Sequence, residues 1–130
     1  MQTGLVTNLK VGIWEWDFAK DGGAEGAIAM RGPKLPVGAI ILAAFLDVEA
    51  AFVGAGSSSA FHVTGANDIY SVAVVGTYTL DALLKGVPDF ATVSDAVRVA
   101  TAAKGVTHTI SGAVLTAGKV NVICAYITPR

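Results

Sequence analysis

Two acidic residues in a long apolar run form the first pair in this sequence whose spacing could do chemistry. Asp47 and Glu49 are two positions apart, and alternate residues of a β-strand project from the same face, so both carboxylates would share one face. Such a pair could bind Ca²⁺ or act as a general acid and base. A calcium site needs more oxygen ligands than the neighbouring sequence supplies, which favours a strand end that emerges into solvent.

The groups of a serine hydrolase occur by type between residues 57 and 68. The run Ser57–Ser59 offers a nucleophile, His62 a base and Asp68 an acid. These serines lie in no Gly-x-Ser-x-Gly turn and in no strand-turn-helix pattern. The glycine- and serine-rich residues 54–59 also lack the Gly-Lys-Ser/Thr ending of a phosphate-binding loop. We therefore predict a loop here and no catalytic residue.

Two histidines and the single cysteine could bind a metal ion if their strands were adjacent. His62, His108 and Cys124 are far apart in the sequence, and their spacing matches no metal-binding motif. His108 has the parity of its apolar strand neighbours, so it points into apolar surroundings where an imidazole needs a hydrogen-bond partner. Cys124 has the parity of a small core residue. We predict no metal ligand and no cofactor.

Trp14 and Trp16 share one face of a predicted strand. Core packing is the commonest use of such residues. Tryptophan also anchors protein interfaces and stacks on sugars, because it offers a large area at a low cost in entropy. Both residues are therefore kept as candidates for an interface or ligand face.

Composition limits the classes of function that the chain can have. Charged residues make up 15% of its 130 residues, against about 25% in an average domain, while hydrophobic residues make up 53%. A surface with so little charge suits packing against other protein. The net charge of −1 and the lack of a basic run argue against nucleic-acid binding.

The sequence predicts neither a membrane span nor a secretory signal. The longest apolar stretch, residues 37–46, is well short of the roughly 20 residues that a spanning helix needs. Residues 1–10 lack a basic region followed by an apolar one. A single cysteine excludes an internal disulfide framework.

Glycine and proline divide the first half of the chain into short runs that favour β-strands. Residues 11–18 alternate, with an aromatic face and a partly acidic one. A glycine-rich loop follows, and residues 27–31 are predicted to return antiparallel to form a hairpin. Residues 38–52, apolar on both parities, predict a strand that is buried on two sides or passes from core to interface, with a buried helix as the disfavoured alternative. Residues 60–64 predict a short strand.

The second half contains a predicted helix and a predicted strand pair. Thr79 could cap a helix of at most two turns over 80–85, with Gly86 after its end. Residues 94–104 fit a strand narrowly better than a helix. Residues 106–110 and 119–127 predict a C-terminal antiparallel pair.

These runs amount to six to eight strands with at most one short helix. We predict an all-β fold, a single-domain β-sandwich over residues 1–130 that is jelly-roll-like, with residues 1–10 as an extended N-terminal arm.

Three segments together resemble small virion structural proteins of tailed bacteriophages. They are Trp-Asp-Phe-Ala-Lys-Asp-Gly-Gly-Ala-Glu-Gly at 16–26, Leu-Pro-Val-Gly-Ala-Ile-Ile at 35–41 leading to Asp47-Val48, and Leu-Thr-Ala-Gly-Lys-Val at 115–120 ending in Ala-Tyr-Ile at 125–127. The group comprises short β-sandwich proteins known as decoration, cement or head-fibre proteins. The likeness runs from near residue 14 to the end and is poor over 66–93.

The resemblance implies a non-enzymatic capsid decoration, or cement, protein. Such a protein binds the outer surface of the assembled head and stabilises it, so the expected location is the virion. The implied partners are the major capsid protein and further copies of the chain, with a homotrimer favoured. A tail, baseplate or head-to-tail connector subunit is one alternative. A carbohydrate-binding module that uses Trp14 and Trp16 is another, and a hydrolase is the least favoured.

Overall fold

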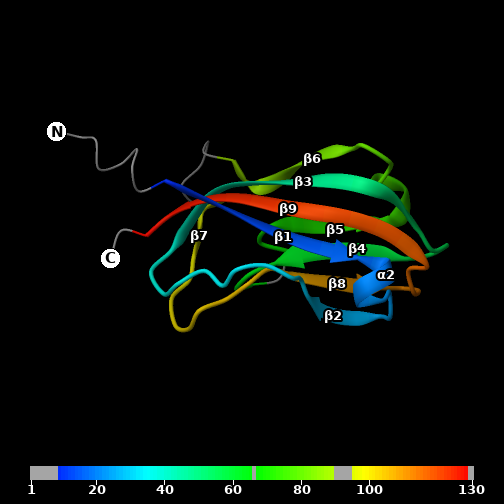
Figure 1. Ribbon diagram of the computed structural model, residues 1–130, viewed down its shortest axis with the longest axis horizontal. Helices are drawn as coiled ribbons and strands as arrows, with labels where there is room; N and C mark the ends of the chain where they lie inside the picture. Colours follow the sequence, from blue (N-terminus) through cyan, green and yellow to red (C-terminus); the bar gives the residue numbers. More distant parts are fainter. Residues whose placement is uncertain (1–8, 66, 90–94, 129–130) are drawn as a thin grey trace.

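A computed structural model describes residues 9–65, 67–89 and 95–128 as two packed antiparallel sheets (Figure 1). The first sheet has the strand order β1 (Lys10–Asp17), β9 (Ala117–Ile127), β3 (Ile40–Val53) and β6 (Leu83–Asp89), and β7 (Val97–Arg98) also pairs with β3. The second has the order β2 (Gly26–Ala29), β8 (Thr107–Ser111), β4 (Ser58–His62) and β5 (Tyr70–Val74). The remaining elements are the one-turn helix α2 (Phe18–Asp21) and the 3-10 turn η1 (Val75–Thr77).

The all-β sandwich predicted from the sequence is confirmed. Apart from β7, the strands divide four and four between the two sheets. The nine strands of the described residues exceed the predicted six to eight, because β5 and β6 lie in a region where no strand was predicted. The predicted N-terminal arm falls largely on residues 1–8, outside the described residues, and Lys10 already belongs to β1.

Alternation in the sequence produces the long strands. In β9, Val120, Val122 and Cys124 face the core and the residues between them face outward. A strand with this period buries one face against the other sheet and leaves the opposite face outside. The predicted long strand over 38–52 is confirmed as β3. Its burial on two sides is wrong, because only one face packs in the core and Phe45, Glu49 and Val53 are exposed.

An aromatic layer fills the space between the sheets. Trp16 packs edge-on against Phe52 at a centroid distance of 5.1 Å and against His108 at 4.8 Å. Phe52 stacks on Tyr78 at 4.5 Å, and Phe61 stacks on His108 at 4.6 Å. These rings come from both sheets, so they join the sheets into one core.

Both predicted hairpins are wrong, because the chain crosses between sheets at those points. β1 pairs with β9 and β2 pairs with β8, so the strands on either side of α2 share only a bridge between Glu15 and Arg31. The indole of Trp16 donates to the carbonyl of Gly22 at 3.0 Å, which holds the loop after α2 against the core. β8 and β9 also lie in different sheets, and the buried Leu115 lies in the crossing between them.

The helix predicted over residues 80–85 is also wrong. Residues 79–82 form a turn in which the amide of Ala82 donates to the carbonyl of Thr79 at 3.1 Å, and β6 follows. Asp81 and Ala82 exchange 2.9 Å backbone hydrogen bonds with Val48 of β3. Pairing with β3 therefore satisfies the backbone groups that a helix would have satisfied internally.

Residues 94–104, for which a strand was narrowly favoured, contain β7 at Val97–Arg98, and Ser94 lies outside the described residues. Within the described ranges, no helix is long and apolar enough to cross a membrane.

Gly86 permits a close contact between β6, β3 and the start of β5. A Cβ atom at Gly86 would lie 2.7 Å from the carbonyl oxygen of Ala44 and 2.9 Å from that of Ile69. Gly86→Ala should therefore lower the free energy of unfolding by about 1–3 kcal/mol, measured by urea denaturation. Gly76→Ala is the control, because a Cβ there meets nothing within 4 Å. Equal stability of the two variants would contradict this account of the contact.

Candidate functional site

The two tryptophans predicted as an interface or ligand face are buried. Trp14 and Trp16 each have 0% exposed surface and pack between the sheets. The indole of Trp14 donates to the carbonyl of Pro33 at 2.6 Å, so each ring also fixes a loop. Because no ring surface is accessible, the surface role is wrong and the alternative of core packing holds.

Asp47 and Glu49 do share one face, as predicted, but that face is the middle of the outer surface of β3 rather than a strand end. Glu49 lies 3.6 Å from the ammonium of Lys119 and accepts a hydrogen bond from the side-chain amide of Asn121. The described residues contain no group of three or more His, Cys, Asp or Glu side chains that could hold a metal ion. Glu49 thus belongs to a network of surface ion pairs.

That network continues across β1. Glu15 lies 3.3 Å from Lys119 and 2.6 Å from Arg31, and Arg31 also contacts Asp21 at 3.0 Å. The hydrogen bond from Arg31 is the largest cause of a lowered pKa at Glu15. These charges neutralise one another and leave no free carboxylate pair for acid–base chemistry.

The structure brings together a serine and a histidine that the sequence did not pair. The Nε2 atom of His108 lies 2.8 Å from the hydroxyl of Ser59, and both residues are buried. The Nδ1 atom of His108 has no partner in the described structure, so no carboxylate orients the ring. A nucleophile and base need both that support and access to substrate, and this pair has neither. Their parity along β4 and β8 was the signal that could have indicated the contact.

The serine, histidine and aspartate of the disfavoured hydrolase interpretation are not brought together either. Asp68 accepts hydrogen bonds from the backbone amides of Val63, Thr64 and Gly65 at 2.7 to 2.9 Å, so its carboxylate braces the loop after β4. His62, at the end of β4, takes no part in this brace.

His108 and Cys124 are buried in different sheets. Burial lowers the pKa of His108 to about 3 and raises the pKa of the Cys124 thiol to about 12. Both groups are therefore neutral near pH 7, and the thiol lacks the thiolate form that reacts and binds metals.

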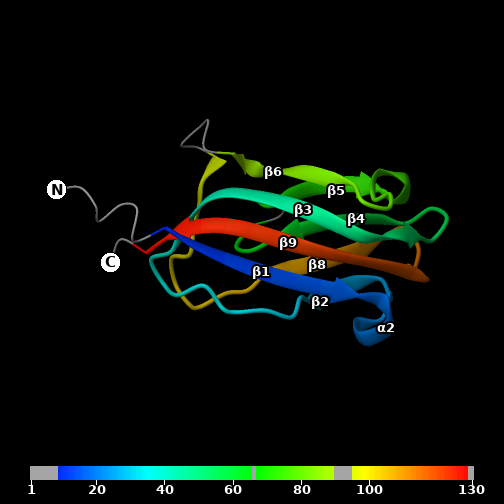
Figure 2. The ribbon, with the colours of Figure 1, turned by 45° about the horizontal axis from the view of Figure 1, so that its top comes forward.

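An apolar surface on the first sheet is a feature that the sequence did not predict. Val11, Ile13, Phe45 and Leu83 are exposed there, Ile13 by 55% and Leu83 by 68%, and half-buried Ile123 lies among them. Ile123 pairs with Ile13 on one side and with Phe45 on the other, so these three form one row. We call this set the outer apolar face, and Figure 2 shows its strands β1, β9, β3 and β6 side by side.

A groove of about 360 Å³ extends this face between β3 and β6. Phe45, Leu83 and Pro88 line it. The groove lies where the pairing register of β3 and β6 shifts between Ala43 and Phe45. Contiguous exposed apolar surface of this kind marks interaction sites in soluble proteins.

The fold is shared with chains of three solved capsid structures. A chain of the cyanophage Pam1 capsid asymmetric unit aligns at a TM-score of 0.64 and 22% identity over 94% of this chain and 86% of that one. A chain of the capsid of Ralstonia phage GP4 aligns at 0.60 and 16% identity over 93% and 86%. A chain of the acidic stable capsid structure of Helicobacter pylori bacteriophage KHP30 aligns at 0.53 and 16% identity over 94% and 89%. No family model and no curated protein matches the sequence.

His108 should make the fold sensitive to acid. The unfolded chain protonates this imidazole as the pH falls through about 6.5, whereas the folded chain does so only near 3, so lower pH favours unfolding. Between about pH 6.5 and 4.5, above the ordinary pKa of the ion-paired carboxylates, the free energy of unfolding should fall by up to about 1.4 kcal/mol per pH unit.

Urea denaturation across this pH range measures the slope. His108→Gln should flatten it, and His62→Gln, which removes the other histidine, should retain it. An unchanged slope in His108→Gln would show that the buried imidazole does not cause it.

Proposed function

We propose that this chain is a non-enzymatic structural protein of a tailed-phage virion, and specifically a decoration protein on the outer surface of the assembled capsid. The observation that carries the proposal is the fold likeness to chains of three phage capsid structures, over nearly the whole chain in each comparison. The segments in the sequence that resemble virion proteins support it independently. The expected partner is the major capsid protein, and the expected location is the virion.

The chemistry of the described residues agrees with a structural role. The Ser59–His108 pair is enclosed in the core, Asp68 braces a loop and Glu49 is ion-paired. A carbohydrate-binding function is not proposed, because Trp14 and Trp16 are buried. A tail, baseplate or connector subunit could have the same sandwich. The location and copy number of the chain in the virion distinguish that alternative.

We further propose that the outer apolar face packs against a neighbouring copy of the chain, within a homo-oligomer that is a trimer. The charges beside the face, on Glu15, Arg31 and Lys119, already pair within the protomer. These paired charges therefore do not by themselves favour a foreign partner of either charge. A stable interface buries about 800 Å² on each partner, so the apolar row would form the centre of the contact.

Stabilisation of a capsid then follows from linkage. A protein that binds the assembled lattice and not its separate subunits lowers the free energy of the lattice. An oligomer that contacts several lattice subunits at once gains effective concentration, so each single contact can be weak. No catalytic step is needed.

Copy number and location in the particle test the main proposal. The purified chain should bind heads of the virus that encodes it, and calibrated gel densitometry should find copies in proportion to the major capsid protein. Electron microscopy of virions carrying the labelled chain should show label over the whole head. A few copies confined to one vertex or to the tail would contradict decoration and indicate a connector or tail subunit.

Ile13→Glu tests the oligomer. A carboxylate at the β1 end of the apolar row would have to be buried without a partner, so sedimentation should show a shift from oligomer to monomer. Val74→Glu is the control, because Val74 is 64% exposed on β5 of the other sheet. An oligomer that dissociates only in the control variant, or a wild-type chain that is monomeric at high concentration, would contradict the proposed contact.

A further inference from the structure

One end of the sandwich carries four cations that have no acidic partner among the described residues. Lys20, Arg31, Lys85 and Lys119 each form an ion pair with a carboxylate. Across residues 9–65, 67–89 and 95–128, four other cations form no ion pair and no side-chain hydrogen bond, namely Lys10, Lys34, Arg98 and Lys104.

Strand pairing places these four cations at the same end of the molecule. Lys10 begins β1 opposite Tyr126 near the end of β9, and Arg98 pairs with the first residue of β3. Lys104 pairs with Leu35, the residue after Lys34. We call this the basic end; β7 marks it in Figure 1.

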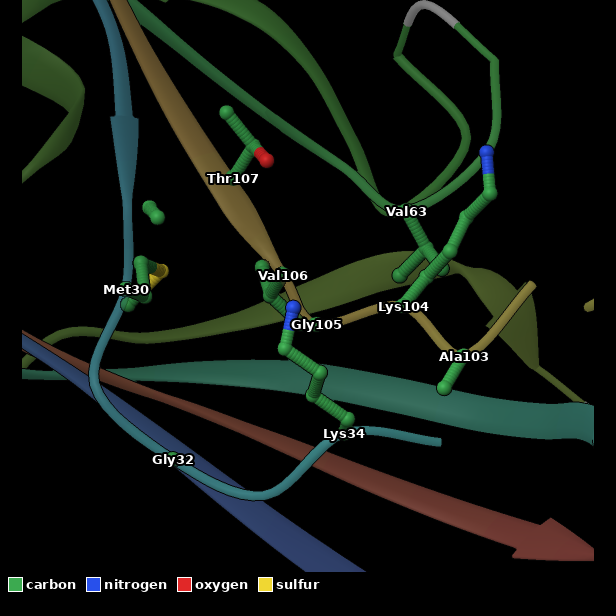
Figure 3. Close-up of a pocket in the computed structure, with 10 residues that line it drawn as sticks. Met30, Gly32, Lys34, Val63, Ala103, Lys104, Gly105, Val106 and Thr107 are labelled. Carbon is green, nitrogen blue, oxygen red and sulfur yellow. The ribbon is translucent and has the colours of Figure 1, made fainter. Parts of the chain in front are cut away.

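A pocket of about 340 Å³ opens at the basic end between two of these lysines. Lys34 and Lys104 line it together with Met30, Val63 and Gly105. Figure 3 shows the two lysine side chains extending from neighbouring segments, with their ammonium groups apart. Lys34 is exposed and Lys104 is half-buried, so both ammonium groups can meet a ligand.

Backbone hydrogen bonds hold the walls of this pocket in place. Leu35 and Lys104 exchange bonds of 2.7 and 3.1 Å, and the amide of Met30 donates to the carbonyl of Val106 at 3.0 Å. On the other side of Lys34, the carbonyl of Pro33 accepts the 2.6 Å bond from the Trp14 indole. Lys34 is thus anchored by both of its neighbours, and the pocket is formed before any ligand arrives.

We propose that this pocket binds an acidic segment of a partner protein, with carboxylates paired to Lys34 and Lys104. Two separated ammonium groups suit a segment with more than one carboxylate better than a single small anion. In the isolated chain Lys34 and Lys104 have no ion pair, while the lysines and arginine away from the basic end do. A partner of opposite charge would supply the carboxylates. Another copy of this chain that met it end to end would present the same basic end, and like charges would repel.

The inference deepens the proposed function, on which its choice of partner rests. A protomer that meets its neighbouring copies through the outer apolar face would keep its basic end free. The acidic segment would then belong to the capsid shell. Each protomer would then contact neighbouring copies through the outer apolar face and the capsid lattice through the basic end.

A peptide titration tests the pocket without the virus. N-acetylated, C-amidated tetraglutamate, titrated into the ¹⁵N-labelled chain at constant ionic strength, should move the amide signals of Gly32, Gly105 and Val106. Lys34→Ala combined with Lys104→Ala should weaken this binding by about 5- to 30-fold. Lys10→Ala combined with Lys20→Ala removes the same charge outside the pocket and should leave it nearly unchanged. Equal losses in both double variants, or equal binding of inorganic phosphate, would overturn the proposal.

Binding to heads links the pocket to the capsid and separates two ways of failing. The wild-type chain and the Lys10/Lys20 variant should bind heads alike, and the Lys34/Lys104 variant should bind at least about fivefold more weakly. If all three bind equally, the pocket assignment is wrong and the decoration role stands. If the wild-type chain does not bind, the decoration role fails, and the peptide titration still decides whether the pocket takes an acidic segment.

Discussion

Packing of aromatic rings from both sheets is the interaction on which the rest of this structure depends. Trp16 contacts Phe52 and His108 edge-on, and Phe61 stacks on His108 from the second sheet. In the described residues the two sheets share few backbone hydrogen bonds, so side-chain packing in the core has to fix how the layers lie. The large rings fill space between the sheets. Each β-strand contributes by alternating side chains that face this core with side chains that face outward.

Two hydrogen bonds join polar groups inside this aromatic layer. The phenol of Tyr78 donates to the backbone carbonyl of Ser59 at 2.8 Å, and the Ser59 hydroxyl contacts His108. Burial keeps the imidazole neutral, so the core tolerates it without a counter-ion. A serine and a histidine that would suggest catalysis on a surface serve here to fix the packing of two strands.

Because the tryptophans are turned inward, the surface available to partners is made of smaller groups. The outer apolar face lies on the broad side of one sheet, and the lysine pocket lies at the end where β1 begins and β9 ends. A face and an end of one sandwich point in different directions. The fold can therefore present two chemically distinct surfaces, one apolar, the other basic with no acidic partner among the described residues.

The sequence by itself determined the class of fold and the long strands, because alternation is a local property that each strand carries. It also placed His108 and Cys124 in the core by parity. Only the tertiary structure decided which strands pair, so both predicted hairpins and the helix over 80–85 were replaced by pairing between distant segments. The burial of Trp14 and Trp16 and the meeting of Lys34 with Lys104 were decided there as well. Parity states that residues share a face, but which face meets the core depends on contacts between segments far apart in the chain.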